Sequence, residues 1–207
     1  IHIAAALRAQ PDNREMLLLQ ARTLIAMGDG DGAGAAIEKL SQGQKPGAEL
    51  AELGAEAALL RKAPDAALDL LGTLGTAEAE RLRALVALQK NDLPAAQAYF
   101  EKAIGDGRNA RAFADYARYR LIAGDVAGAS ELAATASKLA PDAIDSLLIN
   151  GTLLVRRGDL AKAEQAYARA AKLYPASLAA LVGQAAVLGD LNRAKDMDAI
   201  LEKALVL

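Results

Sequence analysis

The strongest constraint on this chain is a short turn motif that recurs at nearly constant spacing. The motif reads GDGDGAGA from Gly28, KNDLPAA from Lys90, GDVAGA from Gly124 and GDLAKA from Gly158, with weaker copies at 63–67 and 193–197. Each of the four clear copies contains a small residue four positions after the first aspartate of the turn: Ala33, Ala96, Ala129 and Ala163. Across all six copies the equivalent positions are 34, 29, 33, 34 and 34 residues apart. A fixed period of this length predicts a repeat architecture.

Proline follows the same period. Pro141, in KLAPD, and Pro175, in KLYPA, lie 34 residues apart, and Pro11, in RAQPDN, occupies the equivalent place before the first unit. Proline removes a backbone donor and disfavours helical geometry in the residue before it. We therefore expect a helix to end before each of these prolines.

Apolar residues within each period have helical spacing. One face of a first helix carries Leu147, Leu148, Gly151 and Leu154, and one face of a second carries Ala163, Ala166, Tyr167, Ala170 and Leu173. Composition agrees, because 51 Ala and 34 Leu are strong helix formers. Nine Ile, six Val and five Thr are too few for a protein built on sheet. The sequence predicts an all-α chain of paired helices.

The best unit, 144–177, resembles the 34-residue tetratricopeptide repeat. It carries the family pattern at Leu147, Gly151, Leu154, Ala163, Tyr167, Ala170 and Pro175, with Asn150 where the family has Leu. The unit 110–143 matches at Phe113, Tyr116, Ala117, Ala129, Ala136 and Pro141, and departs from the pattern at Arg120 and Ala133. The resemblance implies a right-handed α-solenoid of antiparallel helix pairs.

The resemblance covers essentially the whole chain, which is expected to form one solenoid. A leading second helix at about 1–10 precedes six repeats: 14–47, 48–76, 77–109, 110–143, 144–177 and 178–207. The copy within Gly47–Gly75 is short and ends in GTLGT, which predicts a truncated second helix. Repeat arrays need polar caps, but the chain starts mid-unit and ends on the apolar run 204–207. We expect a fragment of a longer array, or ends that meet a partner, including by end-to-end self-association.

Several classes of chemistry are disfavoured. The chain has no cysteine and one histidine, His2, which excludes a thiol nucleophile and a cysteine zinc site. GDGDGAG lacks the preceding strand of a dinucleotide site and the Lys-Ser/Thr of a phosphate loop. Leu40 stands where a calcium loop starting at Asp29 requires glutamate. No catalytic, cofactor-binding or metal-binding residue is predicted, and we expect a protein that is not an enzyme.

Charge and hydropathy narrow the partners. Twenty-four Lys and Arg against 26 Asp and Glu give a net charge of -2, and no basic run exceeds two residues, so nucleic acid is not an expected partner. The longest apolar stretches, such as Leu147–Val155, are about half of the roughly 20 residues that a bilayer requires. Absence of cysteine suits the bacterial cytoplasm and periplasm equally, which leaves the compartment open.

In the tetratricopeptide family, the first helix of each pair lines a concave groove that holds an extended peptide or a partner helix. The resemblance implies a protein–protein interaction scaffold with candidate contacts at Arg22, Glu52, Glu56, Arg81, Arg111, Asp115, Arg118, Tyr119, Thr152 and Arg156. This groove is acidic toward its N-terminal half and more basic around Arg111, Arg118 and Arg156. The carboxylate clamp of chaperone-binding members is not reproduced, since its positions hold Leu18, Arg22, Glu52, Glu56 and Arg81.

The segment FADYARYR from Phe113 is the best candidate for a peptide contact, because Arg and Tyr are favoured at binding hot spots. In the alternative interpretation, Tyr116 is a core residue and the arginines are only solvated. A second function also stays open by analogy of fold: the periplasmic helical part of an envelope-assembly or polysaccharide-export complex.

Overall fold

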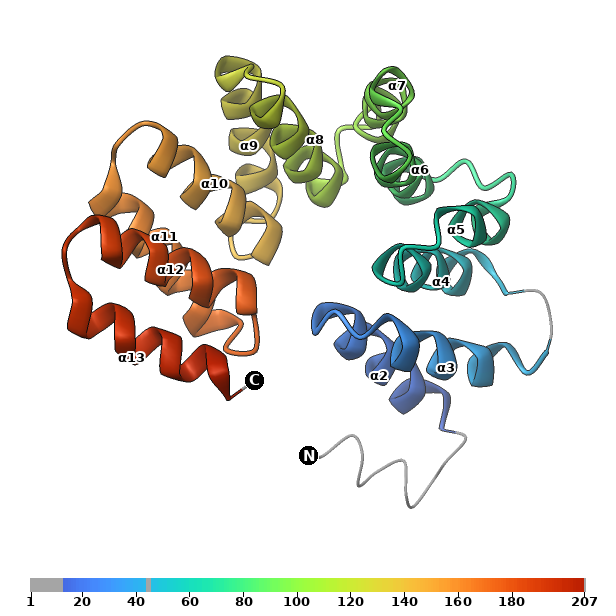
Figure 1. The fold of residues 1–207 in the computed structure, drawn as a ribbon. Helices are drawn as coiled ribbons and strands as arrows, with labels where there is room; N and C mark the ends of the chain where they lie inside the picture. Colours follow the sequence, from blue (N-terminus) through green and yellow to red (C-terminus); the bar gives the residue numbers. More distant parts are fainter. Residues whose placement is uncertain (1–12, 44–45, 207) are drawn as a thin grey trace. The chain divides into compact units, whose positions relative to one another are not determined.

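The structure, a computed structural model, describes residues 13–43 and 46–206. This part of the chain contains twelve helices and no strand (Figure 1). They form six consecutive pairs: α2 (Arg14–Ala26) with α3 (Gly30–Ser41), α4 (Ala48–Leu60) with α5 (Pro64–Leu71), α6 (Ala77–Gln89) with α7 (Leu93–Ala103), α8 (Ala110–Ile122) with α9 (Val126–Leu139), α10 (Ile144–Arg156) with α11 (Leu160–Leu173), and α12 (Leu178–Asp190) with α13 (Ala194–Leu205). The expected leading helix at 1–10, and His2 within it, lie outside the described residues.

The chain divides into two compact units, residues 1–105 and residues 106–207. Unit 1 holds α2 to α7 and unit 2 holds α8 to α13. We call the first helix of each pair the A helix and the second the B helix. Within each unit, successive A helices contact one another, and each B helix packs against its own A helix. The fold is therefore all-α, as predicted.

All six pairs are joined by the same three-residue turn. Its middle residue has a left-handed backbone, with φ of 79° at Gly28, 58° at Lys62, 58° at Asn91, 87° at Gly124, 78° at Gly158 and 59° at Asn192. The amides of the middle and third residues donate back to the end of the A helix: Gly124 N to Leu121 O at 3.2 Å and Asp125 N to Arg120 O at 2.9 Å. This is the Schellman motif, which satisfies the last carbonyls of a helix.

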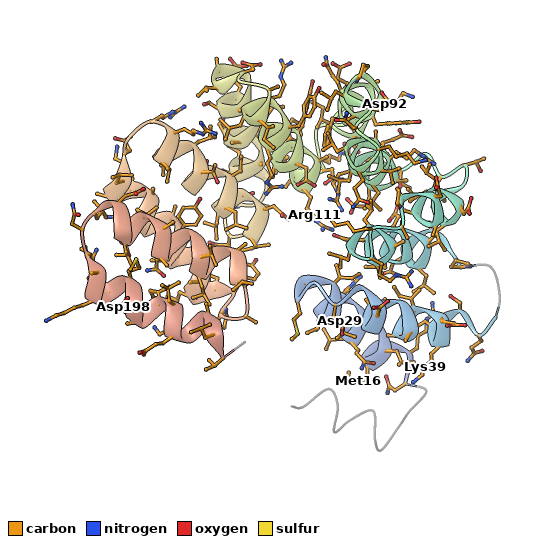
Figure 2. All side chains as sticks on the ribbon, in the orientation of Figure 1. Met16, Asp29, Lys39, Asp92, Arg111 and Asp198 are labelled. Atoms are coloured by element: carbon orange, nitrogen blue, oxygen red, sulfur yellow. The ribbon has the colours of Figure 1, made fainter. Side chains whose placement is uncertain are left out.

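The third residue of the turn also starts the B helix. The carboxylates of Asp29, Asp92 and Asp125 accept backbone N–H groups three residues on, at 2.8, 3.0 and 2.9 Å. Figure 2 shows Asp29 and Asp92 at the starts of α3 and α7. Glycine or asparagine ends one helix and aspartate caps the next, and this pairing explains the recurring Gly-Asp dipeptide and the single Asn-Asp dipeptide at 91–92.

The second B helix is short, as expected. α5 has 8 residues, fewer than any other described helix, and its C-cap is Gly72 with φ of 46°. A left-handed glycine at this place ends the helix. The B helix is thereby shortened by about one turn relative to the 11-residue α7 that follows it.

In the core, small residues leave room for a few large side chains to pack between helices. Tyr167 of α11 is 8% exposed and lies against Gly151 of α10 and Gly183 of α12. A Cβ atom at Gly151 would lie 2.7 Å from Tyr167 Cζ, and one at Gly183 would lie 2.6 Å from Tyr167 Cδ1. Gly151, which the sequence analysis placed on one face of its helix, forms one side of the slot, and Gly183 provides the other side.

None of the described helices is both long and apolar enough to cross a bilayer.

Candidate protein-interaction surfaces

The predicted groove residues of unit 1 lie on its A helices, and each makes a polar contact to the neighbouring A helix. Arg22 Nη2 of α2 lies 2.5 Å from Glu49 Oε1 of α4, an exposed pair. Glu52 of α4 accepts a hydrogen bond from the hydroxyl of Thr76, the N-cap of α6. These polar contacts connect neighbouring A helices across the face that sequence reasoning assigned to a partner.

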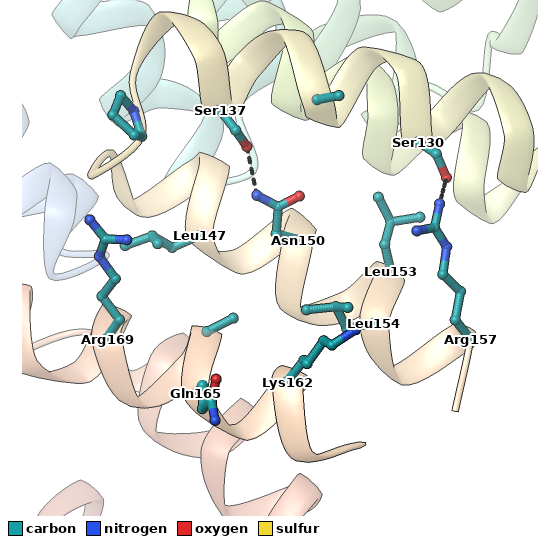
Figure 3. Close-up of a pocket in the computed structure, with 13 residues that line it drawn as sticks. Ser130, Ser137, Leu147, Asn150, Leu153, Leu154, Arg157, Lys162, Gln165 and Arg169 are labelled. Atoms are coloured by element: carbon teal, nitrogen blue, oxygen red, sulfur yellow. Dashed lines mark hydrogen bonds between the residues drawn. The ribbon is translucent and has the colours of Figure 1, made fainter. Parts of the chain in front are cut away.

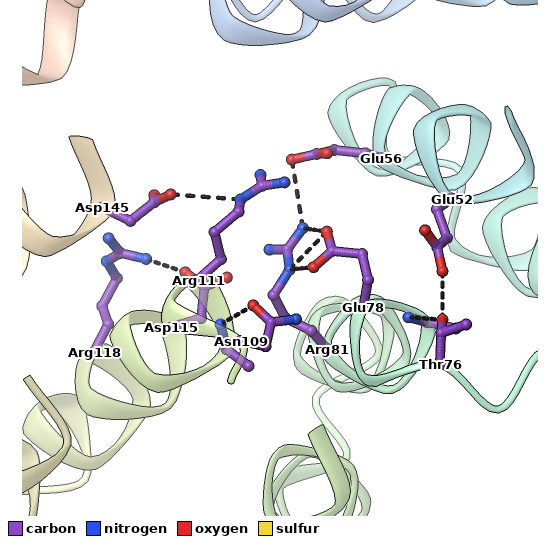
Figure 4. Close-up of polar contacts among 12 residues, drawn as sticks. Glu52, Glu56, Thr76, Glu78, Arg81, Asn109, Arg111, Asp115, Arg118 and Asp145 are labelled. Atoms are coloured by element: carbon purple, nitrogen blue, oxygen red, sulfur yellow. Dashed lines mark hydrogen bonds and ion pairs between the residues drawn. The ribbon is translucent and has the colours of Figure 1, made fainter. Parts of the chain in front are cut away.

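Arg81 of α6 is the most buried of these residues, at 2% exposed. Its Nη2 donates to Glu78 Oε1 at 2.7 Å and its Nε to Glu78 Oε2 at 3.0 Å, while Glu56 of α4 lies 3.5 Å from Nη2 (Figure 4). A bidentate guanidinium–carboxylate pair fixes the side chain in one orientation. Arg81 thus ties α4 to α6 and exposes little surface for a partner. The ion pair between Glu78 and Arg81 could have been predicted from the sequence, because residues three apart on a helix are neighbours.

The predicted residues of unit 2 lie on α8 and α10 and range from buried to exposed. Arg118 Nη1 lies 2.5 Å from Asp115 Oδ1, with side chains 42% and 8% exposed. Arg111 Nε lies 3.5 Å from Asp145 Oδ2 and so bridges α8 to α10 (Figure 4). Tyr119 stacks on Tyr116 with ring centroids 6.0 Å apart. Tyr116 is 5% exposed, so within FADYARYR it is a core residue, while Arg118 reaches the surface.

The last two predicted residues differ in exposure. Thr152 Oγ1 donates to Leu148 O at 2.9 Å and lies 3.0 Å from the hydroxyl of Tyr167. Thr152 therefore supports the tyrosine that fills the Gly151–Gly183 slot. Arg156, at the end of α10, is exposed.

The A-helix face of unit 2 changes in character from α8 to α12. The three A helices are related by 34 residues, so residues at that spacing occupy equivalent places. Arg118 of α8 is replaced by Thr152 on α10 and by Ala186 on α12. On α12 the exposed apolar side chains are Leu178, at 56%, and Val182, at 49%. The face is thus charged on α8 and apolar on α12.

A pocket that sequence reasoning missed lies on the other side of unit 2. It has a volume of about 750 Å³ and is walled by the B helices α9 and α11, with α10 as its floor (Figure 3). Its lining residues are Ser130, Ala134, Ser137, Pro141, Leu147, Asn150, Leu153, Leu154, Arg157, Lys162, Gln165, Ala166 and Arg169. We call it the α9–α11 pocket. Its only advance signal was Asn150, which stands where the repeat pattern has leucine.

A smaller pocket of about 300 Å³ occupies the equivalent place in unit 1, between α3 and α5 and above α4. Positions 96 residues apart correspond in the two pockets, as Arg61 with Arg157 and Ser41 with Ser137. A gap between successive B helices is therefore a feature of both units.

Asp29, the first residue of the segment that was tested as a calcium loop, has a structural role. Asp29 caps α3 through Gly32 N. Across residues 13–43 and 46–206, no group of three His, Cys, Asp or Glu side chains is arranged to hold a metal ion.

Comparison with known proteins places the fold. No protein-family model matches the chain, and no curated protein matches it in sequence. Among solved structures, it is similar to a chain of the APC/C hetero-tetramer Cut9–Hcn1, with a TM-score of 0.81, 17% identity and coverage of 98% of this chain and 40% of that one. It is similar to IFIT1 with Gppp-AAAA, with a TM-score of 0.70, 15% identity and coverage of 86% and 46%.

A third similar structure is a tetratricopeptide repeat protein from Parabacteroides merdae, with a TM-score of 0.58, 12% identity and coverage of 93% of this chain and 79% of that one. The chain spans less than half the length of the Cut9–Hcn1 and IFIT1 chains. Six helix pairs, one recurrent turn, the Gly–Tyr–Gly slot and these likenesses agree on one architecture. The chain is a helical-repeat protein with the tetratricopeptide-repeat fold.

Proposed function

We propose that this protein is a non-catalytic interaction scaffold and that the A-helix face of unit 2 binds an extended segment of a partner protein. The observation that carries the proposal is the graded surface of that face. Arg118 and Arg156 present exposed positive charge on α8 and α10. Val182 and Leu178 present exposed apolar surface on α12.

This gradient specifies the chemistry of the partner segment. Carboxylates favour the arginines through charge-assisted hydrogen bonds, and aliphatic or aromatic side chains favour the surface of Val182 by burial. Tyr119 is already stacked on Tyr116, so little conformational entropy is lost when a partner covers it. The proposed ligand therefore carries acidic residues near α8 and apolar residues near α12.

Charge supports a protein partner over nucleic acid. The net charge of the chain is -2, and two of the arginines on this face, Arg111 and Arg118, already face Asp145 and Asp115. Tight binding to a phosphate backbone needs a concentrated and uncompensated basic surface.

The test is an affinity capture from the native lysate with the parent protein and two variants side by side. Arg118→Ala/Tyr119→Ala and, separately, Val182→Asp should each lose a partner that the parent retains. Lys138→Ala/Lys172→Ala removes two exposed charges from the last turns of B helices and serves as the matched control. Circular dichroism must show equal helix content in all four proteins. Equal recovery of every partner from all four would reject the A-helix face of unit 2 as the binding surface.

A further inference from the structure

We propose that the α9–α11 pocket is a second binding site, separate from the A-helix face, and that it takes an extended acidic peptide segment. The pocket lies between B helices, so its occupant does not compete for Arg118 or Tyr119. Its shape, its charge and its difference from the unit 1 pocket each support the assignment.

The pocket lies in the space between α9 and α11. The two helices do not approach within 8 Å between Cα atoms, and α9 packs less extensively on α10 than α11 packs on α12. Two hydrogen bonds join α10 to α9 beside this space. Asn150 Nδ2 donates to Ser137 Oγ at 2.6 Å, and Arg157 Nη2 donates to Ser130 Oγ at 2.7 Å (Figure 3). Small side chains, Ala134 and Ala166, leave the space between the walls open.

The lining carries three cations, Arg157, Lys162 and Arg169, and no carboxylate. Arg157 bonds to a neutral hydroxyl and has no carboxylate within 4.0 Å among the described residues. The other two cations have exposed partners outside the lining: Lys162 lies 3.9 Å from Asp159 and Arg169 lies 2.5 Å from Asp142. Exposed pairs contribute at most about 1 kcal/mol, so carboxylates of a ligand can replace them at small cost.

The dimensions suit a short extended peptide. From Leu147 to Arg157, α10 is about 15 Å long at about 1.5 Å per residue. An extended chain covers about 3.3 Å per residue, so the floor holds roughly five residues. Side chains of an extended peptide alternate in direction. Apolar ones can cover Leu153 and Leu154 on the floor, while acidic ones face the cations on the rim.

The unit 1 pocket differs from the α9–α11 pocket in both charge and size, and two substitutions account for the difference. At the positions of Ala134 and Ala166 it carries Glu38 and Leu70, 96 residues earlier. Glu38 introduces a carboxylate into the lining, and Leu70 occupies space that Ala166 leaves free. The pocket there is about 300 Å³ instead of about 750 Å³. Ala134→Glu and Ala166→Leu therefore transfer to unit 2 the two features that disfavour an acidic peptide.

The probe is a fluorescein-labelled hexapeptide of alternating glutamate and leucine, titrated with the intact protein and followed by anisotropy. Ala134→Glu and Ala166→Leu should each weaken binding at least about tenfold. Ala199→Glu adds the same charge at an exposed site of α13 and should leave the affinity unchanged. Ala134 and Ala166 are not fully buried, so thermal midpoints should stay near that of the parent.

Two further peptides separate charge from shape. Replacing each glutamate by glutamine should weaken binding about tenfold or more, and replacing each leucine by glycine should weaken it severalfold. The proposal is overturned if the parent shows no binding at about 1 mM protein, or if Ala134→Glu and Ala166→Leu bind as the parent does. It is equally overturned if inorganic phosphate displaces the peptide and the leucines contribute nothing, because the pocket is then a small-anion site.

Discussion

Tyr167 is the residue on which the packing of unit 2 depends most directly. Its ring fills a slot between Gly151 and Gly183, where any added Cβ would lie under 3.0 Å from the ring. Because glycines bound the ring on two sides, it cannot move from one without approaching the other. Gly183→Ala should therefore destabilise the fold by about 1–3 kcal/mol through overpacking, measured by urea unfolding.

A second glycine of α12, Gly189, supplies the control for the Gly183→Ala prediction. A Cβ at Gly189 of α12 would lie 3.3 Å from the flexible sulfur of Met197. Gly189→Ala should thus be neutral or stabilise by up to about 1 kcal/mol, since alanine favours helix. In a Tyr167→Ala background, the cost of Gly183→Ala should largely vanish. Additive costs in that double variant would show that the ring and the glycine do not clash.

A substitution at Ser146 is expected to raise the stability of the fold, whereas Gly183→Ala is expected to lower it. Ser146 lies in the first turn of α10, is 1% exposed, and its hydroxyl has no hydrogen-bond partner among the described residues. A buried hydroxyl without a partner costs about 1–3 kcal/mol. Ser146→Ala removes the hydroxyl without adding volume, so it should stabilise the protein by about 1 kcal/mol. A lower urea midpoint for the variant would reveal a bond that the hydroxyl makes.

At the scale of elements, the recurrent turn sets how each helix pair is joined. Its middle residue is left-handed whether it is glycine, asparagine or lysine. Non-glycine residues pay a steric cost of about 1 kcal/mol there. Lys62→Gly, at φ of 58°, should therefore stabilise by up to about 1 kcal/mol, and Gly158→Ala, at φ of 78°, should destabilise by about 1–2 kcal/mol. Thermal unfolding of the two variants against the parent tests both signs, and equal midpoints would exclude this role for the turn.

Local signals explain why the helix pairs were predictable. In a Gly-Asp dipeptide the glycine ends one helix and the aspartate caps the next through an amide three residues on. Because both effects are local, they can be recognised from the sequence alone. Gly72, in the run GTLGT, likewise marks the end of α5. The helical spacing placed Gly151 and Tyr167 on the apolar faces of two successive helices, and in the structure these two residues lie against each other.

The candidate binding surfaces were harder to predict from the sequence, because they depend on the distances between helices. Sequence register placed Arg81 and Arg118 on one face, but one is buried in a bidentate pair and the other is 42% exposed. The α9–α11 pocket arises from how far apart two B helices stand, which no single motif encodes. Asn150 marked a departure from the repeat pattern, and only the packing shows that the departure lines a cavity.

For the whole molecule, the division into two units makes a prediction about folding. Unit 2 comprises three helix pairs with their own core, including the Tyr167 slot. Repeat proteins need about three repeats for stability, because each repeat buries its apolar face only against its neighbours. The fragment 106–207 should therefore be helical and unfold in one cooperative thermal transition, as measured by circular dichroism.

The same fragment also tests where the second binding site is held. Every residue that lines the α9–α11 pocket lies between 130 and 169, inside unit 2. If unit 2 folds as an independent body, the fragment should bind the glutamate–leucine hexapeptide within about threefold of the full chain. Ala134→Glu should weaken that binding in the fragment by the same factor as in the full chain. A helical fragment that has lost the peptide would mean that residues 1–105 shape the pocket, since nothing in its lining was removed.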